Sequence, residues 1–170
     1  MPSISTKQFG IVEFAEEDIF DFPNGLPGFE AERRFLCIER PGLRPVVFLQ
    51  SLDHSDLCFI TLPARSVDPG YQLEVAAEER NVLGLAAATA PLWEQSLACL
   101  AIVCLPSDGT ATANLLGPVV LSRETRKGVQ AVRDDCRYSA ITPLQPGTTE
   151  QNAANPSPVR KGNADRLAEV

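Results

Sequence analysis

The sequence predicts an all-β fold: a single small antiparallel β-barrel-like or sandwich domain over residues 1–144, with one or two short helices, and a disordered polar tail over residues 145–170. Three observations lead to this fold class. Short runs of β-branched and aromatic residues recur along the chain, turn-forming residues separate these runs, and the composition changes near Leu144. With 170 residues, 44% of them hydrophobic, the chain suffices for one domain with a buried core.

Seven segments carry the strand pattern, and turn signals such as Pro41-Gly42 and Asp108-Gly109 separate them. The run 97–105 is apolar on both faces, which predicts a central strand. Many short strands with regular turns are typical of antiparallel sandwiches and barrels. The predicted strands are residues 9–14, 34–39, 46–50, 58–62, 97–105, 118–122 and 128–132.

Helices are expected to be few and short. Residues 76–83 predict one helix, and Gly84 suits the left-handed position that follows a helix end. Residues 16–18 are expected to form one acidic turn, and residues 88–95 stay ambiguous between helix and loop. Residues 145–170 contain no aromatic residue and are rich in Pro, Asn, Gln and Thr, so they bury too little apolar surface to offset their chain entropy.

The charge distribution bears on partners and location. The tail holds three of the 15 basic and three of the 22 acidic residues, so the whole net charge of −7 lies in residues 1–144. An acidic body disfavours direct nucleic-acid binding and suits a basic protein partner, although a modest negative charge also simply favours solubility. No apolar run is long enough to cross a membrane, and the N-terminus lacks a signal peptide. We therefore expect a cytoplasmic protein.

No cofactor, metal or catalytic set is expected. The five cysteines are an odd number without C-x-x-C spacing, which argues against a disulfide framework and structural zinc, and four of them lie in apolar runs typical of buried thiols (Cys37, Cys58, Cys99, Cys104). His54 is the single histidine, and the polar segment 51–56 around it is better explained as a turn between two strands than as a hydrolase site. A small-ligand-binding or enzymatic β-barrel remains the alternative function.

The segment 21–30, Asp-Phe-Pro-Asn-Gly-Leu-Pro-Gly-Phe-Glu, packs two Pro/Gly turns into ten residues. Pro27-Gly28 predicts a type II turn, because Gly28 accepts a positive φ without a Cβ clash. Phe22, Leu26 and Phe29 are too apolar for an ordinary solvated loop. The segment is therefore either a structural corner anchored to the core or an apolar binding surface.

The segment 112–118, Thr-Ala-Asn-Leu-Leu-Gly-Pro, is the second informative stretch. The side chain of Asn114 can bond neighbouring backbone and hold a bulge or turn. Leu115 and Leu116 are adjacent and cannot both face the core of a regular strand. Either the backbone is irregular here or one leucine offers an apolar contact to a partner.

Four further segments accompany these two: Thr6-Lys-Gln-Phe-Gly10, Phe48-Leu-Gln-Ser51, Arg126-Lys-Gly128 and Tyr138-Ser139. In this order and at these separations, the set resembles the flagellar assembly factor family (FliW) over about residues 4–144. The resemblance implies a small all-β regulatory protein without catalysis, which binds flagellin before export and also binds the translational repressor CsrA. The five cysteines, the alanine-rich stretch 86–95 and the tail depart from the family pattern.

The predicted function is thus a cytoplasmic, non-enzymatic antagonist of CsrA that allows flagellin mRNA to be translated when flagellin is exported. We expect a monomer without cofactor. Leu26 and Phe29 would be the apolar anchors of its binding surface, and Glu30 would steer a basic partner. The candidate partner-binding residues are Phe22, Asn24, Leu26, Phe29, Glu30, Asn114 and Leu115.

Overall fold

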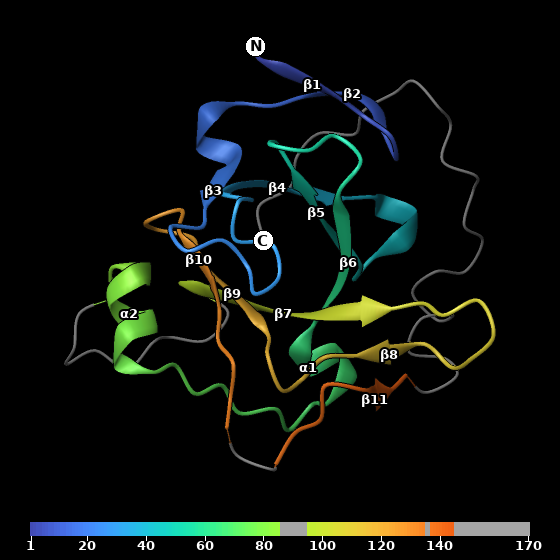
Figure 1. The fold of residues 1–170 in the computed structure, drawn as a ribbon, viewed down its shortest axis with the longest axis vertical. Coiled ribbons are helices and arrows are strands. Elements are labelled where there is room, and N and C mark those ends of the chain that lie inside the picture. Colours follow the sequence, from blue (N-terminus) through green and yellow to red (C-terminus); the bar gives the residue numbers. More distant parts are fainter. Residues whose placement is uncertain (86–94, 135–136, 145–170) are drawn as a thin grey trace.

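The computed structural model describes residues 1–85, 95–134 and 137–144 and confirms the all-β prediction (Figure 1). Within these residues short strands dominate, and the two α-helices and two 3-10 helices are small. The elements are β1 (Ser3–Thr6), β2 (Gly10–Glu13), η1 (Glu16–Asp18), β3 (Ile19–Asp21), β4 (Arg34–Glu39), η2 (Pro41–Leu43), β5 (Val47–Ser51), β6 (Cys58–Pro63), α1 (Ala64–Val67), α2 (Ala77–Leu83), β7 (Leu97–Cys104), β8 (Thr112–Ala113), β9 (Val119–Ser122), β10 (Gly128–Gln130) and β11 (Thr142–Pro143).

One antiparallel sheet organises the molecule. Its strand order is β10-β9-β7-β6-β5-β4-β3, with β8 paired to β7 and β11 paired to β8, while β1 and β2 form a separate hairpin. The long strand β7 lies between β6 and β9, as its two apolar faces predict. Its last residue, Cys104, reaches solvent, so the buried position expected for this thiol is wrong, whereas Cys37 and Cys99 are buried.

The sheet curls but does not close into a barrel. Its two edge strands, β3 and β10, meet at one isolated parallel bridge between Asp21 and Lys127. The backbone N–H of Asp21 donates to the carbonyl of Arg126 over 2.8 Å. This contact partly covers both edges of the sheet, which would otherwise present unpaired backbone groups.

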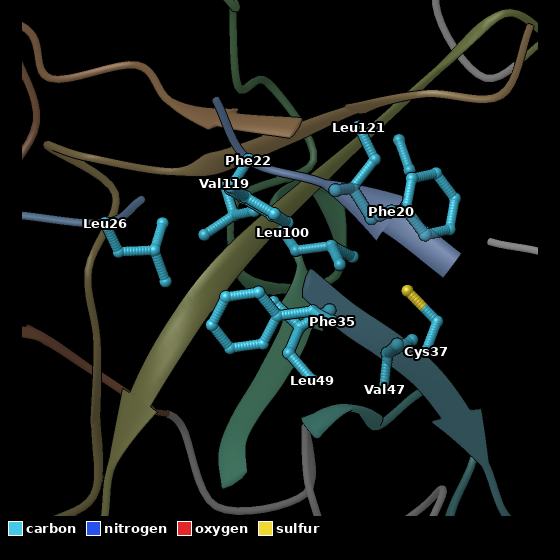
Figure 2. Packing of buried hydrophobic residues seen from close by; sticks show 11 residues of the cluster. Phe20, Phe22, Leu26, Phe35, Cys37, Val47, Leu49, Leu100, Val119 and Leu121 are labelled. Carbon is cyan, nitrogen blue, oxygen red and sulfur yellow. The ribbon is translucent and has the colours of Figure 1, made fainter. Parts of the chain in front are cut away.

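The main core lies inside the curl, and its aromatic and aliphatic side chains converge from β3, β4, β5, β7 and β9 (Figure 2). Phe22 and Phe35 pack edge-to-face there, with ring centroids 5.0 Å apart. A second core cluster surrounds Tyr71 and includes Leu115, and a third lies under the β1–β2 hairpin. The main core therefore receives Phe22 and Leu26 from the loop after β3, and this burial fixes the position of the loop.

The seven predicted strands correspond to β2, β4, β5, β6, β7, β9 and β10, and the 34–39 prediction coincides with β4. The acidic turn at 16–18 and the helix ending before Gly84, which has φ 72°, are also confirmed. β1, β3, β8, β11 and α1 were not expected, because runs of two to four residues carry too little periodicity. The predictions for residues 88–94 and for the tail 145–170 lie outside the described residues.

Candidate functional site

The segment between β3 and β4, residues 22–33, forms a closed loop that we call the Pro/Gly loop. The N–H of Phe22 donates to the carbonyl of Arg33 over 2.7 Å and closes its base. Inside it, the N–H of Phe29 donates to the carbonyl of Leu26 over 2.7 Å, and Gly28 between them has φ 84°. These two observations are the signature of the predicted type II turn.

Gly25 is the tightest point of the Pro/Gly loop. It has φ 64°, and a Cβ built on it would lie 2.7 Å from both the Cα and the carbonyl oxygen of Glu30. Backbone atoms cannot yield as a flexible side chain does. Glycine is therefore required here both for the left-handed conformation and for the close crossing of the two halves of the loop.

The Pro/Gly loop directs its predicted site residues to opposite sides. Phe22 and Leu26 are 0% and 1% exposed, so they lie in the core and support the loop from below instead of offering a surface to a partner. Asn24 and Glu30 are exposed. Phe29 is 41% exposed and rests edge-to-face on Phe59, at a centroid distance of 5.1 Å. Of the two expected apolar anchors, the structure therefore leaves Phe29 accessible and buries Leu26.

The segment before β10 holds the Pro/Gly loop from the other edge of the sheet. A Cβ on Gly128 would lie 2.4–2.7 Å from three ring atoms of Phe22, so the absence of a side chain at 128 makes room for this ring. The Arg126 guanidinium lies 4.7 Å from the centroid of the Phe20 ring. The weak Arg126-Lys127-Gly128 motif is thus part of the support of the loop, which the sequence did not reveal.

Two carboxylates tie the end of the Pro/Gly loop to the β5–β6 turn. The buried Glu32 accepts a 2.5 Å hydrogen bond from the Ser51 hydroxyl, and its other carboxylate oxygen contacts Nδ1 of His54. Asp53 accepts the N–H of Arg33 over 2.8 Å and that of Arg34 over 3.1 Å. Burial of Asp53 opposes ionisation, but these hydrogen bonds, together with the hydrogen bond and the positive charge of the Arg34 guanidinium, outweigh it and lower the pKa of the carboxyl below its ordinary value.

The same contacts exclude a serine–histidine catalytic pair at this turn. The Ser51 hydroxyl donates to Glu32, and its oxygen accepts the backbone N–H groups of Asp53 and His54 over 3.0 Å each. Its proton is therefore directed to the carboxylate and not to the imidazole, unlike in a Ser-His-acid triad. The segment 51–56 is the polar turn that its sequence predicts.

The segment 112–118 continues from β8 into irregular backbone before β9. Its sequence left two alternatives, irregular backbone or a leucine exposed to a partner, and the structure shows the first. Leu115 is 2% exposed, and its carbonyl accepts the Tyr71 hydroxyl over 2.9 Å. The Asn114 side chain accepts the Gly117 N–H over 2.8 Å and holds the turn. Leu115 packs in the Tyr71 cluster and Leu26 in the main core, so the structure does not bring these two leucines onto one surface.

A groove of about 320 Å³ adjoins the exposed side of the Pro/Gly loop; we call it the acidic groove. One wall comes from the loop, the other from α2, and β10 supplies the floor, an arrangement consistent with the position of α2 beside β10 in Figure 1. Its α2 wall was missed from the sequence, where the signal was the acidic pair at 78–79. The lining residues are Asn24, Gly25, Pro27, Glu30, Glu78, Glu79, Val82, Val129 and Gln130.

Gln130 connects the acidic groove to the segment 112–118, because its side-chain amide donates to the Gly117 carbonyl over 2.8 Å. In the groove wall, the Glu30 carboxylate accepts the Gly28 N–H over 3.0 Å, which lowers the pKa of Glu30.

Within the described ranges, no three His, Cys, Asp or Glu side chains gather as a metal site. No helix in these ranges has the length and apolar composition to span a membrane.

Comparison with known proteins agrees with this architecture. The profile of the FliW protein family matches residues 3–144. Flagellar assembly factor FliW of Caldanaerobacter subterraneus is 33% identical over 143 residues, which cover 83% of this chain and 91% of that protein. The Syntrophomonas wolfei protein of the same name is 33% identical over 144 residues, covering 84% of this chain and 88% of its own length.

A solved structure shares the fold as well as the sequence pattern. The crystal structure of a flagellar assembly factor FliW superposes with a TM-score of 0.72 at 28% identity, covering 85% of this chain and 98% of that one. The matched region spans the Pro/Gly loop, the segment before β10 and the β8–β9 connection. This chain therefore belongs to the FliW family.

Proposed function

We propose that the protein is a non-catalytic, monomeric cytoplasmic factor of flagellar assembly that binds flagellin before export and also binds the translational repressor CsrA. Family membership over residues 3–144 is the observation that carries this proposal, since the matching relatives bear the name flagellar assembly factor. Binding without catalysis suits the site, because Ser51, Glu32 and His54 form no nucleophile–base pair. No observation favours the enzymatic alternative.

In this proposal the two partners exchange. Flagellin that stays in the cell occupies the protein, and export of flagellin frees the protein to sequester CsrA, so that flagellin mRNA is translated. Exchange on a shared or coupled surface makes the affinity for one partner depend on the concentration of the other. The protein thereby links the synthesis of flagellin to its export.

The proposed binding surface is the exposed side of the Pro/Gly loop, with Phe29, Asn24 and Glu30. The Phe29 ring is partly exposed, and its edge-to-face contact with Phe59 holds it in place. A partly exposed and well-supported aromatic ring is typical of anchor residues in protein interfaces. Phe22, Leu26 and Leu115 contribute from the core by fixing the backbone. Asn114 shapes the β8–β9 connection next to Gln130.

Affinity purification of the tagged full-length chain from its own host, followed by mass spectrometry, tests the proposal. We expect flagellin and CsrA to co-purify, and a Phe29→Ala variant to bind at least one of them about tenfold or more weakly, as for an aromatic hot spot. Ile141→Ala is the matched control, because Ile141 is an exposed apolar residue outside the Pro/Gly loop. Recovery of neither partner by the folded protein would refute the function, and equal binding by both variants would refute the surface.

A further inference from the structure

The acidic groove has walls that are fixed in place. On the α2 side, the Thr125 hydroxyl donates to the Leu83 carbonyl over 2.7 Å, and the Leu83 side chain is fully buried. On the loop side, the backbone at Gly25 packs closely against the backbone of Glu30, and the buried Leu26 anchors the turn. A groove between two anchored elements needs little reorganisation on binding, which lowers the entropic cost of association.

The lining of this groove combines acidic walls with an apolar floor. Glu30, Glu78 and Glu79 contribute three carboxylates, and among the residues that the structure describes no Lys or Arg belongs to the lining. Glu30 and Glu79 each accept one backbone N–H, from Gly28 and Ala76 respectively, which occupies one of about four acceptor positions of a carboxylate. Both side chains are thus oriented and keep acceptor capacity for a cation.

The apolar part of the lining limits what the groove would accept. Val82 is half-buried and Val129 is 8% exposed; both line the groove and offer a limited contact for an aliphatic side chain or the stem of a Lys or Arg. Nucleic acid is disfavoured, because its phosphates would face three carboxylates without a compensating cation in the lining. A volume of about 320 Å³ is at the low end for ligand pockets, and suits a few side chains of a peptide.

A second depression extends this surface past α2. It shares Glu79 with the acidic groove, has a volume of about 470 Å³, and includes Val75 and the 56% exposed Val132. Its buried Arg133 is paired with Glu74 over 3.3 Å, so this guanidinium does not offset the carboxylates of the neighbouring groove. The two depressions thus meet at Glu79, and each carries apolar side chains in its lining.

We propose that the acidic groove binds a basic segment of a partner protein, with a Lys or Arg between Glu30 and the Glu78–Glu79 pair and an aliphatic group on Val82 and Val129. This inference rests on the proposed function as a partner-binding factor and adds a location and a chemistry to it. The segment carries at least one cationic and one aliphatic side chain at neighbouring positions. Its attraction to the groove weakens with salt, since the carboxylates lie at the surface.

An NMR titration of the ¹⁵N-labelled full-length protein tests the proposal. The probe is the amidated peptide KLKRLK, and its charge-reversed counterpart is ELEELE. We expect KLKRLK to shift the amide signals of Gly25, Val82 and Gln130, and a Glu30→Gln/Glu78→Gln variant to bind it about tenfold more weakly. Glu79 is left unchanged because it caps the start of α2.

The matched control carries the same change of charge away from the groove. Glu13→Gln/Asp108→Asn removes two exposed carboxylates on β2 and in the β7–β8 connection, and is expected to bind KLKRLK like the parent. Equal loss in both variants, shifts at other residues, or binding of ELEELE at the same amides would overturn the proposal. A shift of the amide signals of residues 159–166 on addition of the peptide would also overturn the proposal, since the tail of this chain, and not a partner protein, would then be the occupant of the groove.

Affinity purification and the peptide titration, both carried out on the parent protein, separate this inference from the proposed function. If the parent recovers flagellin and CsrA but the peptide does not bind at the groove, the function stands and the groove assignment fails. If the peptide binds there and neither protein is recovered, the groove assignment stands and the proposed function fails.

Discussion

Replacing Gly128 by alanine perturbs the point where β10 meets the Pro/Gly loop. The added Cβ would lie 2.4, 2.6 and 2.7 Å from three atoms of the Phe22 ring. Contacts below 3.0 Å require a displacement, and the ring has little freedom because it is fully buried and packs on Phe35. The clash therefore strains the core and the base of the loop together.

The expected cost of this substitution is about 3 kcal/mol, the upper part of the usual range for overpacking a core. For a chain of this size, that loss lowers Tm by about 6–12 °C. Urea unfolding followed by circular dichroism measures the change, and Gly42→Ala is the control because its Cβ meets nothing within 4 Å. We expect the control to stay within about 0.5 kcal/mol of the parent.

A double-mutant cycle identifies the cause of the loss. Phe22→Leu shortens the side chain that meets the new methyl group, so Gly128→Ala/Phe22→Leu should be more stable than the two single changes predict by addition. The coupling between contacting residues is expected to be about 0.5–3 kcal/mol. Additive effects, or a Gly128→Ala variant as stable as the control, would refute the steric explanation.

Three other predictions concern the loop, its carboxylate support and the thiols. Gly25→Ala should lower the free energy of unfolding by about 1–3 kcal/mol in urea titrations, because the position has φ 64° and faces Glu30 backbone at 2.7 Å; an unchanged midpoint would contradict this. The folded-state pKa of Asp53 lies below its ordinary value. The ionised Asp53 carboxylate therefore stabilises the fold fully at pH values above the ordinary pKa, and this stabilisation is lost as pH falls through the lower folded-state pKa. Unfolding titrations from pH 7 down to about pH 2 should show a smaller acid-dependent loss in Asp53→Asn than in the parent, and identical slopes would exclude this role. Burial raises the pKa of Cys99 to about 12, whereas Cys104 is exposed, so peptide mapping after a short treatment with iodoacetamide at pH 8 should find Cys104 labelled first; equal labelling would contradict the burial of Cys99.

The central part of the fold could be predicted because strand residues buried on one or both faces repeat with a recognisable period. The run 97–105 and the run 34–39 show this, and they became β7 and β4. β8 and β11 pair through two residues each, so their pairing depends on Leu144 and Tyr71 packing in one cluster and not on a local pattern. The isolated bridge between Asp21 and Lys127 at the sheet edges is equally non-local.

The turns of the Pro/Gly loop could be predicted from the sequence, but the direction of its side chains could not. Composition and turn residues marked the Pro/Gly loop, and its type II turn followed from Gly28. A loop has no period, however, so the sequence could not decide that Leu26 faces the core and Phe29 faces solvent. The α2 wall of the acidic groove comes from a helix far from the loop in the sequence, Ala77–Leu83, and became visible only through tertiary packing.

The burial of Phe22 and Leu26 strengthens the case for a binding role of the Pro/Gly loop. A loop that carries Phe29 on a mobile backbone would lose conformational entropy on association, at a cost that reduces affinity. Here the core holds the loop through Phe22 and Leu26, and Glu32 ties its end to the β5–β6 turn. Under the proposed function, the aromatic ring would therefore meet a partner already positioned, and weakening the core contacts should reduce affinity even where no contact with the partner is lost.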